Sequence, residues 1–172
     1  MAMSAQAISA LKNRWLASQI DVEFPTPESR AGYALYQQRI AHAITEPLHL
    51  SLDNQAAHFS ADDLFLVDFH RLTIFFAQLQ AQVWQTPEQQ ALTIEFFTQI
   101  IYSEPCDLYL GFQAGEPVAC AILTQQEETA LISDVVTLGN DATLAEDFVR
   151  ALMQRCQLKD RAEIFIESIS NR

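Results

Sequence analysis

The spacing of hydrophobic residues changes near residue 105, and this change constrains the fold more than any other feature of the sequence. Before it, apolar side chains recur at steps of three and four, as on one face of a helix. After it they alternate, as along a β-strand. A chain of 172 residues is about the size of one domain. We therefore expect a single domain over 1–172, with a mainly helical half over 1–105 and a sheet half over 106–172.

The first half carries the start signals of several helices. Thr26 and Thr86 each stand directly before a proline, which places a capping hydroxyl next to a proline at the first helical position. Ser60 and Asp63 have the spacing of a capping box. The predicted helices cover about 4–19, 26–46, 60–83 and 86–102. Short alternating segments at 21–25 and 48–52 predict two strands.

The second half alternates around one clear turn. Leu108, Leu110 and Phe112 fall on one side of a strand, and Gly115 in the turn that follows is free to adopt a positive φ. Further segments predict a partner strand around 118–122, a third strand over 130–138, a helix over about 142–157 and a last strand over 162–167. A strand–helix–strand unit makes its two strands parallel. The predicted fold class is α+β: a helical half packed on a mixed, mostly antiparallel sheet with one parallel crossover.

The charge of the chain excludes several kinds of partner. Its 22 acidic and 10 basic residues give a net charge of −12, and only Lys12 and Lys159 are lysines. Nucleic acids and anionic membranes are bound largely through Lys and Arg, so we expect neither as a partner. The four glycines are not spaced to form a phosphate-binding loop.

The cysteines and histidines predict neither a disulfide nor a metal site. Cys106, Cys120 and Cys156 are odd in number and form no C-x-x-C, so we expect reduced thiols. No two of the four histidines lie three or four residues apart, as they do in H-E-x-x-H, and we expect no metal site. The first residues lack a basic segment followed by an apolar one, and no run of about 18 apolar residues occurs. These features predict a cytoplasmic protein.

The order of the predicted elements in the second half, and the residues of its hairpin turn, resemble those of a known superfamily. The segment 108–123, with its Gly-Glu-Pro-Val turn, followed by the strand 130–138 and the helix after it, is similar to the GNAT-type N-acetyltransferases. The resemblance covers about residues 60–168. It implies a GNAT-like fold in which the helix over about 142–157 is the cofactor-binding helix. It also implies that an acyl-CoA, if one binds, pairs with the backbone of Val135, Val136 and Leu138.

The chain lacks the motif that is diagnostic of that superfamily, Q/R-x-x-G-x-G/A before the cofactor-binding helix. Here the corresponding residues include Asp141, Glu146 and Asp147. Carboxylates at a helix start stabilise the helix dipole and repel a phosphate that would bind there. We therefore expect no cofactor, and acetyl-CoA and CoA are disfavoured.

The chain also ends at Arg172, five residues after Glu167, where the superfamily continues with a helix and two more strands. The predicted GNAT-like fold is incomplete unless the first 50 residues or a second subunit complete the sheet. An exposed strand edge invites pairing between chains, so a homodimer through the sheet edge is one expectation.

Two strand carboxylates are candidates for catalysis. In an acetyltransferase, Asp134 or Glu167 could act as the general base that deprotonates an amine, provided that burial raised its pKa. The competing interpretation, which we favour, is a carboxylate hydrogen bonded to its neighbours. We therefore predict a degenerate acetyltransferase-like protein that is a non-catalytic binding or protein-interaction module. The alternative is an N-acyltransferase with an atypical acyl-CoA site, and no residue selects a ligand or partner.

Overall fold

A computed structural model describes residues 1–51 and 58–170. The first half contains α1 (Ala5–Ser18), α2 (Pro27–Ile40), β1 (Ala43–Pro47), the 3-10 turn η1 (Ala61–Asp63), β2 (Leu64–Leu66), α3 (His70–Ala81) and α4 (Pro87–Phe97). The second half contains β3 (Cys106–Gln113), β4 (Glu116–Gln126), β5 (Thr129–Thr137), η2 (Leu138–Asn140), α5 (Ala142–Arg155), η3 (Leu158–Asp160) and β6 (Glu163–Ile169).

The six strands form one sheet in the order β1-β6-β5-β4-β3-β2. Strands β5 and β6 are parallel and are joined through α5, while the other neighbours are antiparallel. The predicted hairpin and crossover are therefore confirmed, and so is the α+β fold class.

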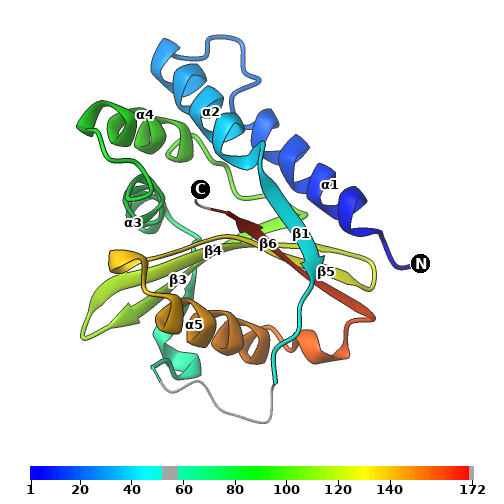
Figure 1. Ribbon diagram of the computed structural model, residues 1–172. Helices are drawn as coiled ribbons and strands as arrows, with labels where there is room; N and C mark the ends of the chain where they lie inside the picture. Colours follow the sequence, from blue (N-terminus) through cyan, green and yellow to red (C-terminus); the bar gives the residue numbers. More distant parts are fainter. Residues whose placement is uncertain (52–57, 171–172) are drawn as a thin grey trace.

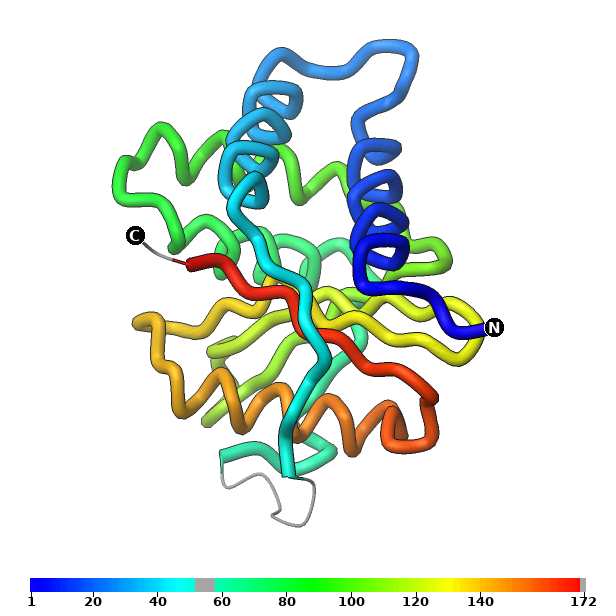
Figure 2. Tube along the Cα trace, turned by 45° about the vertical axis from the view of Figure 1, so that its right-hand side comes forward, coloured from blue at the N-terminus to red at the C-terminus, as the bar shows by residue number. Residues whose placement is uncertain are grey.

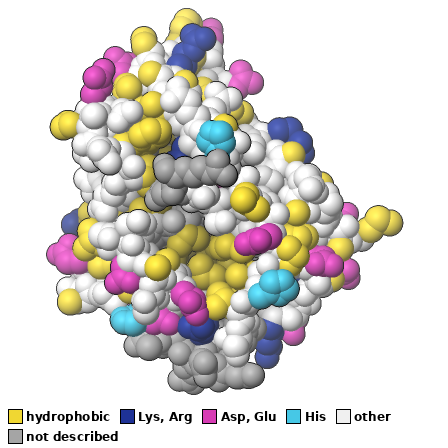
Figure 3. Space-filling model, in the orientation of Figure 1, with side chains coloured by type: hydrophobic (Ala, Val, Ile, Leu, Met, Phe, Trp, Pro, Cys, Tyr) yellow, Lys and Arg dark blue, Asp and Glu magenta, His cyan; other side chains and the backbone are white. Residues whose placement is uncertain are grey.

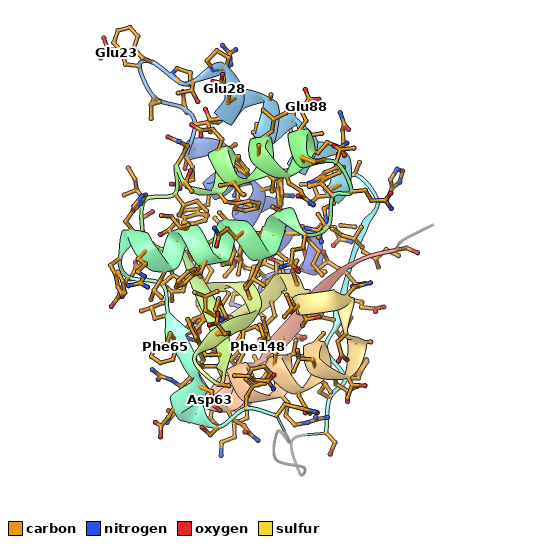
Figure 4. The ribbon with its side chains drawn as sticks, turned by 90° about the vertical axis from the view of Figure 1, so that its left-hand side faces the viewer. Glu23, Glu28, Asp63, Phe65, Glu88 and Phe148 are labelled. Atoms are coloured by element: carbon orange, nitrogen blue, oxygen red, sulfur yellow. The ribbon has the colours of Figure 1, made fainter. Side chains whose placement is uncertain are left out.

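Helices cover both faces of the sheet (Figure 1). Helices α1 to α4 lie on one face, where Leu108, Leu110 and Ile122 from the strands share a core with Phe76 and Phe96. Helix α5 covers the other face, and its Phe148 is fully buried, pointing from the helix toward the strands (Figure 4). The acidic side chains Glu23, Glu28 and Glu88 lie at the far end of the helical layer, away from the sheet (Figure 4).

The N-terminal region completes the sheet beside its last strand. Strand β1 pairs antiparallel with β6, from Ala43 opposite Ile169 to Pro47 opposite Phe165 (Figure 2). Strand β6 is therefore an interior strand, and the outermost strands of the described sheet are β1 and β2. Of the two ways to complete the sheet, the one within the chain is present, whereas a homodimer stays a prediction.

Three predictions for the segments around α2 and β1 are wrong. Ile44 continues the helical spacing of Ile40, but α2 ends at Ile40 and Ile44 lies in β1. Residues four apart share a face in both a helix and a strand, so this spacing does not separate the two structures. No strand forms at 21–25. Residues 48–51 are not part of a strand, although the Leu48 N–H donates to the Ile164 oxygen of β6 at 2.8 Å, and residue 52 lies outside the described residues.

The helix predicted from Ser60 begins ten residues later, at His70. Asp63 does accept a hydrogen bond from the Ser60 backbone N–H (2.7 Å), but this capping interaction opens only the short turn η1. The next three residues pair with β3 instead, and Phe65 packs against Phe112 with ring centroids 5.1 Å apart. Pairing with a strand edge, which spacing along the chain does not encode, decides the structure here.

Helices α2 and α4 pack so closely at Gly32 that a Cβ there would lie 2.0 Å from the backbone oxygen of Leu92. Gly32→Ala gains about 1 kcal/mol of helix propensity, but we expect the clash to dominate and to destabilise the fold by roughly 1–3 kcal/mol net. Urea unfolding measures the difference. Ala34→Ser, at an exposed position of the same helix, is the control and should change stability by less than about 0.5 kcal/mol. A stabilised Gly32→Ala variant would contradict this packing.

Candidate functional site

The parallel strands β5 and β6 separate halfway along their length. Their paired positions end at Ile132 and Ile166, although β5 continues to Thr137 and β6 to Ile169. The cause is a bulge in β5: the register with β4 shifts here, and Asp134 has a φ of 55°. A bulge bends its strand and ends regular pairing, so the two strands diverge beyond it.

A cleft of about 1040 Å³ opens between the separated strands and the helices around them. Its apolar lining comes mainly from Leu48, Leu50, Val83, Trp84, Val135, Val136, Val149, Ile166 and Ile169. Its lining also includes the charged residues Arg39, Asp134, Glu146 and Glu167. Figure 3 shows a recess with a largely hydrophobic floor and with acidic and histidine side chains at its rim. The cleft therefore combines apolar walls with a few charged groups, as small-molecule sites do.

A buried lysine from the first helix contacts two carboxylates of residues that line the cleft. The side chain of Lys12 is fully buried, and its Nζ lies 2.5 Å from Glu167 Oε1 and 3.6 Å from Asp134 Oδ2. The same ammonium donates to the Tyr36 hydroxyl at 2.9 Å. Lys12, Tyr36, Asp134 and Glu167, which we call the Lys12 cluster, join α1 and α2 to β5 and β6.

Hydroxyl groups satisfy the remaining acceptors of both carboxylates, apart from one oxygen. Glu167 Oε2 accepts from Ser9 Oγ (2.7 Å) and Thr45 Oγ1 (3.2 Å). Asp134 Oδ2 accepts from Ser133 Oγ (2.7 Å), while its Oδ1 is buried with no hydrogen-bonding partner among the described residues. Glu167 is thus held by three donors from α1 and β1, and its position is fixed from the helical layer.

The environment of the Lys12 cluster shifts two pKa values in opposite directions. Burial acts to raise the pKa of Asp134, but the positive charges of Lys12 and Arg39 outweigh it and hold that pKa below its usual value. Burial, reinforced by the nearby Asp134 and Glu167, raises the pKa of Tyr36 well above its usual value. At neutral pH, Asp134 is a paired carboxylate and Tyr36 is a neutral phenol.

The bulge at Asp134 is held by a buried glutamine. Gln80 of α3 is fully buried, and its Nε2 donates to the backbone oxygen of Asp134 at 2.6 Å. Its Oε1 accepts from Arg39 Nη1 at 3.5 Å, a long contact. A buried amide thus connects the bulge in β5 to the guanidinium on the wall of the cleft.

The candidate residues chosen from the sequence have different positions in this site. Asp134 and Glu167 come together at Lys12, and Val135 and Val136 line the cleft. Leu138 instead lies in the turn η2, is 52% exposed and is not among the residues that line the cleft.

The acidic start of α5 has the structure of a cap. Asp141 Oδ1 accepts from the backbone N–H groups of Thr143 and Leu144, both at 3.0 Å. Glu146 and Asp147, which the sequence also placed at the helix start, pair with Arg150 at 2.9 and 3.0 Å. The side chain of Asp141 therefore occupies the backbone donors that a phosphate would use.

Sequence reasoning missed Lys12, although the sequence holds a signal for it. Lys12 stands four residues after Ile8 and four before Leu16, in the middle of the buried stripe of α1. A charged residue inside an apolar stripe needs a buried partner of opposite charge, because an unpaired buried charge is costly. The partner lies 155 residues away in the sequence, and spacing cannot identify it.

The cysteine thiols are poor nucleophiles in this structure. Burial raises the pKa of Cys106 and of Cys120 to about 12, and it also raises that of Cys156.

Over residues 1–51 and 58–170, no three His, Cys, Asp or Glu side chains are grouped to hold a metal ion. None of the helices in these ranges is long and apolar enough to cross a membrane.

Comparison with known proteins gives structural matches alone. No protein-family model and no curated protein matches the chain. A conserved protein of unknown function from Staphylococcus epidermidis ATCC 12228 is similar with a TM-score of 0.49 and 10% identity, over 64% of this chain and 44% of that one. A proposed GNAT-family acetyltransferase from Novosphingobium aromaticivorans DSM 12444 is similar with a TM-score of 0.41 and 12% identity, over 75% and 61%. The chain thus spans less than two thirds of either protein.

Replacing Lys12 with methionine tests whether the Lys12 cluster stabilises the fold. Lys12→Met keeps most of the side-chain volume but leaves two buried carboxylates without their ammonium, so we expect a loss of about 3–5 kcal/mol in the free energy of unfolding. Urea unfolding at neutral pH measures it. Lys159→Met changes the other lysine, which is exposed, and should have little effect. Equal stability of the two variants would show that the cluster contributes little.

The lowered pKa of Asp134 predicts a loss of stability in acid. Because its folded-state pKa lies below the unfolded value of about 3.9, its contribution is complete above that value and is lost as the pH falls through the folded pKa. Asp134→Asn should therefore lose less stability than the wild type between about pH 5 and about pH 3. Asp160→Asn, at an exposed position, serves as the control. A wild-type acid dependence in Asp134→Asn would rule out this assignment.

Proposed function

We propose that this chain is a GNAT-like protein that holds a small ligand in the cleft between β5 and β6 and does not transfer acetyl groups from CoA. The observation that carries the proposal is the contact of one buried lysine with both candidate catalytic carboxylates. The open cleft favours a small ligand over a purely structural or protein-docking role, because no side chain of residues 1–51 or 58–170 fills it.

The arrangement of the strands supports the GNAT-like part of the proposal. The hairpin of β3 and β4 is followed by a strand, a helix and a parallel strand, as the resemblance in the sequence implies. The bulge at Asp134 and the separation of β5 from β6 open the site beside Val135 and Val136, where the resemblance expects a ligand.

Neither carboxylate is available as a general base. Such a base must reach the proton that it removes and must have a pKa near the working pH. The side chains of Asp134 and Glu167 are only 1% and 3% exposed, and both lie against the Lys12 ammonium. The pKa of Asp134 is lowered, not raised. To accept a proton from a ligand in the cleft, either carboxylate would first have to lose its contact with Lys12.

The start of α5 does not favour a pyrophosphate. The backbone N–H groups of a helix start bind phosphate when they are free, but Asp141 accepts from two of them. Glu146 lies one turn further along and also lines the cleft. A CoA diphosphate placed there would find two of the donors already bound to Asp141.

One observation favours the alternative, an N-acyltransferase. Beyond Ile132 the residues of β5 are no longer paired with β6, so the backbone of Val135 faces a cleft instead of a neighbouring strand. A backbone site can hold a pantetheine arm without any particular side chain. This second function requires that an acyl-CoA binds without breaking the hydrogen bonds of Asp141 or the contacts of Lys12.

Calorimetric titration with acetyl-CoA and with free CoA separates the two functions. We expect no saturable heat up to about 1 mM of either ligand, which corresponds to binding weaker than about 4 kcal/mol. Asp141→Ala removes the competing carboxylate and is the matched variant. Binding of acetyl-CoA to the wild-type protein tighter than about 100 µM would contradict the proposal and support the acyltransferase.

A further inference from the structure

We propose that the cleft binds an apolar carboxylic acid, with the carboxylate on Arg39 and the hydrocarbon body against the apolar walls. This inference rests on the proposed function, since it requires that the cleft holds a small ligand. It adds the chemical class of that ligand, which the separated strands alone do not define.

Arg39 is the one Lys or Arg among the described residues that line the cleft. It lies in the last turn of α2 and is half-buried. Its guanidinium makes no ion pair with a described carboxylate, and its hydrogen bond is the 3.5 Å contact with Gln80 Oε1. A guanidinium has five N–H donors, so most of those on Arg39 remain for a ligand.

One Nη group of Arg39 contacts the buried amide of Gln80. The amide of Gln80 is fully buried and is oriented by its 2.6 Å hydrogen bond to the backbone of Asp134, so its oxygen faces Arg39. A guanidinium held at one edge keeps its other edge for a planar acceptor. Carboxylates match this geometry and are bound through two parallel hydrogen bonds.

The negative charges of the cleft are already engaged. Glu167 is bonded to Lys12, Ser9 and Thr45, and Glu146 is paired with Arg150 at 2.9 Å. The Asp134 side chain is only 1% exposed and lies 3.6 Å from Lys12 Nζ. Arg39 is therefore the charged residue of the lining that has no ion-pair partner among the described residues, and a ligand carboxylate would meet N–H donors there where a ligand ammonium would meet a cation.

The walls define the rest of the ligand. Leu48 and Leu50 lie on one side, Trp84 follows α3, and Val149 and Ile166 complete an apolar surface. A single guanidinium in a chain of net charge −12 does not compensate a polyphosphate. One negative charge on a hydrocarbon body of about ten carbons suits a cleft of this size and lining.

Three probes with the same chain length and different head groups test the inference: decanoate, decanol and decylamine. Binding is measured by calorimetry below the micelle concentration and by the fluorescence of Trp84, one of two tryptophans in the chain. We expect decanoate to bind the wild-type protein at least about tenfold more tightly than decanol, and decylamine to bind most weakly.

Arg39→Gln removes the charge and should abolish the preference for decanoate over decanol while leaving decanol binding within about twofold. Arg30→Gln is the matched control, because Arg30 is exposed on the same helix and does not line the cleft. It should keep the wild-type preference. Circular dichroism confirms that both variants are folded.

The outcomes separate the inference from the proposed function. Equal binding of the three probes, stronger binding of decylamine, or an unchanged preference in Arg39→Gln would overturn the carboxylate assignment while the cleft still holds a ligand. A second variant, Ala145→Trp, fills the cleft from α5 and should abolish binding of all three probes. No binding of any probe to the wild-type protein, or full binding to Ala145→Trp, would overturn both.

Discussion

The ammonium of Lys12 is the charge on which the arrangement of this protein depends. It is withdrawn from water completely, and its partners come from three other elements: α2, β5 and β6. Removing an ion from water costs several kcal/mol, so such a group persists only where its contacts compensate for that loss. The contacts with Glu167, Asp134 and Tyr36 do so. They also fix the helical layer against the point where the two parallel strands diverge.

This position links the stability of the fold to the chemistry of the cleft. The same lysine that anchors α1 occupies the oxygens of Glu167 and Asp134 that a catalyst would need free. The bulge at Asp134 opens the cleft, and Gln80 stabilises the bulge through its backbone. What remains accessible is an apolar cleft with the guanidinium of Arg39 on its wall. Ligand binding is therefore the function that we propose for this arrangement.

The sheet half was predictable from the sequence because its signals are local. The alternation of Leu108, Leu110 and Phe112 gives the face of β3, and Gly115 takes the positive φ that its turn needs. Local signals also mislead where two structures share a spacing, as at Ile44, or where a strand edge recruits a segment, as at Phe65.

The site was predictable only in part. Asp134 and Glu167 could be chosen as strand carboxylates, but their meeting at Lys12 depends on contacts between segments far apart in the chain. Arg39 and Gln80 carry no local signal, because an arginine near a helix end and a glutamine in a helix are ordinary features. The acidic cap at Asp141 was evident from the position of this residue, since a carboxylate at a helix start commonly caps the helix.

A double-mutant cycle on Lys12 and Glu167 tests most directly whether they form one stabilising unit. The free energies of unfolding of Lys12→Met, Glu167→Gln and the double variant are compared with that of the wild-type protein. If the pair acts as a unit, the double variant should be more stable than the sum of the single effects predicts, by about 1 kcal/mol or more. Effects that add to within about 0.5 kcal/mol would mean that Lys12 does not hold Glu167, and the account of the cleft built on that contact would be wrong.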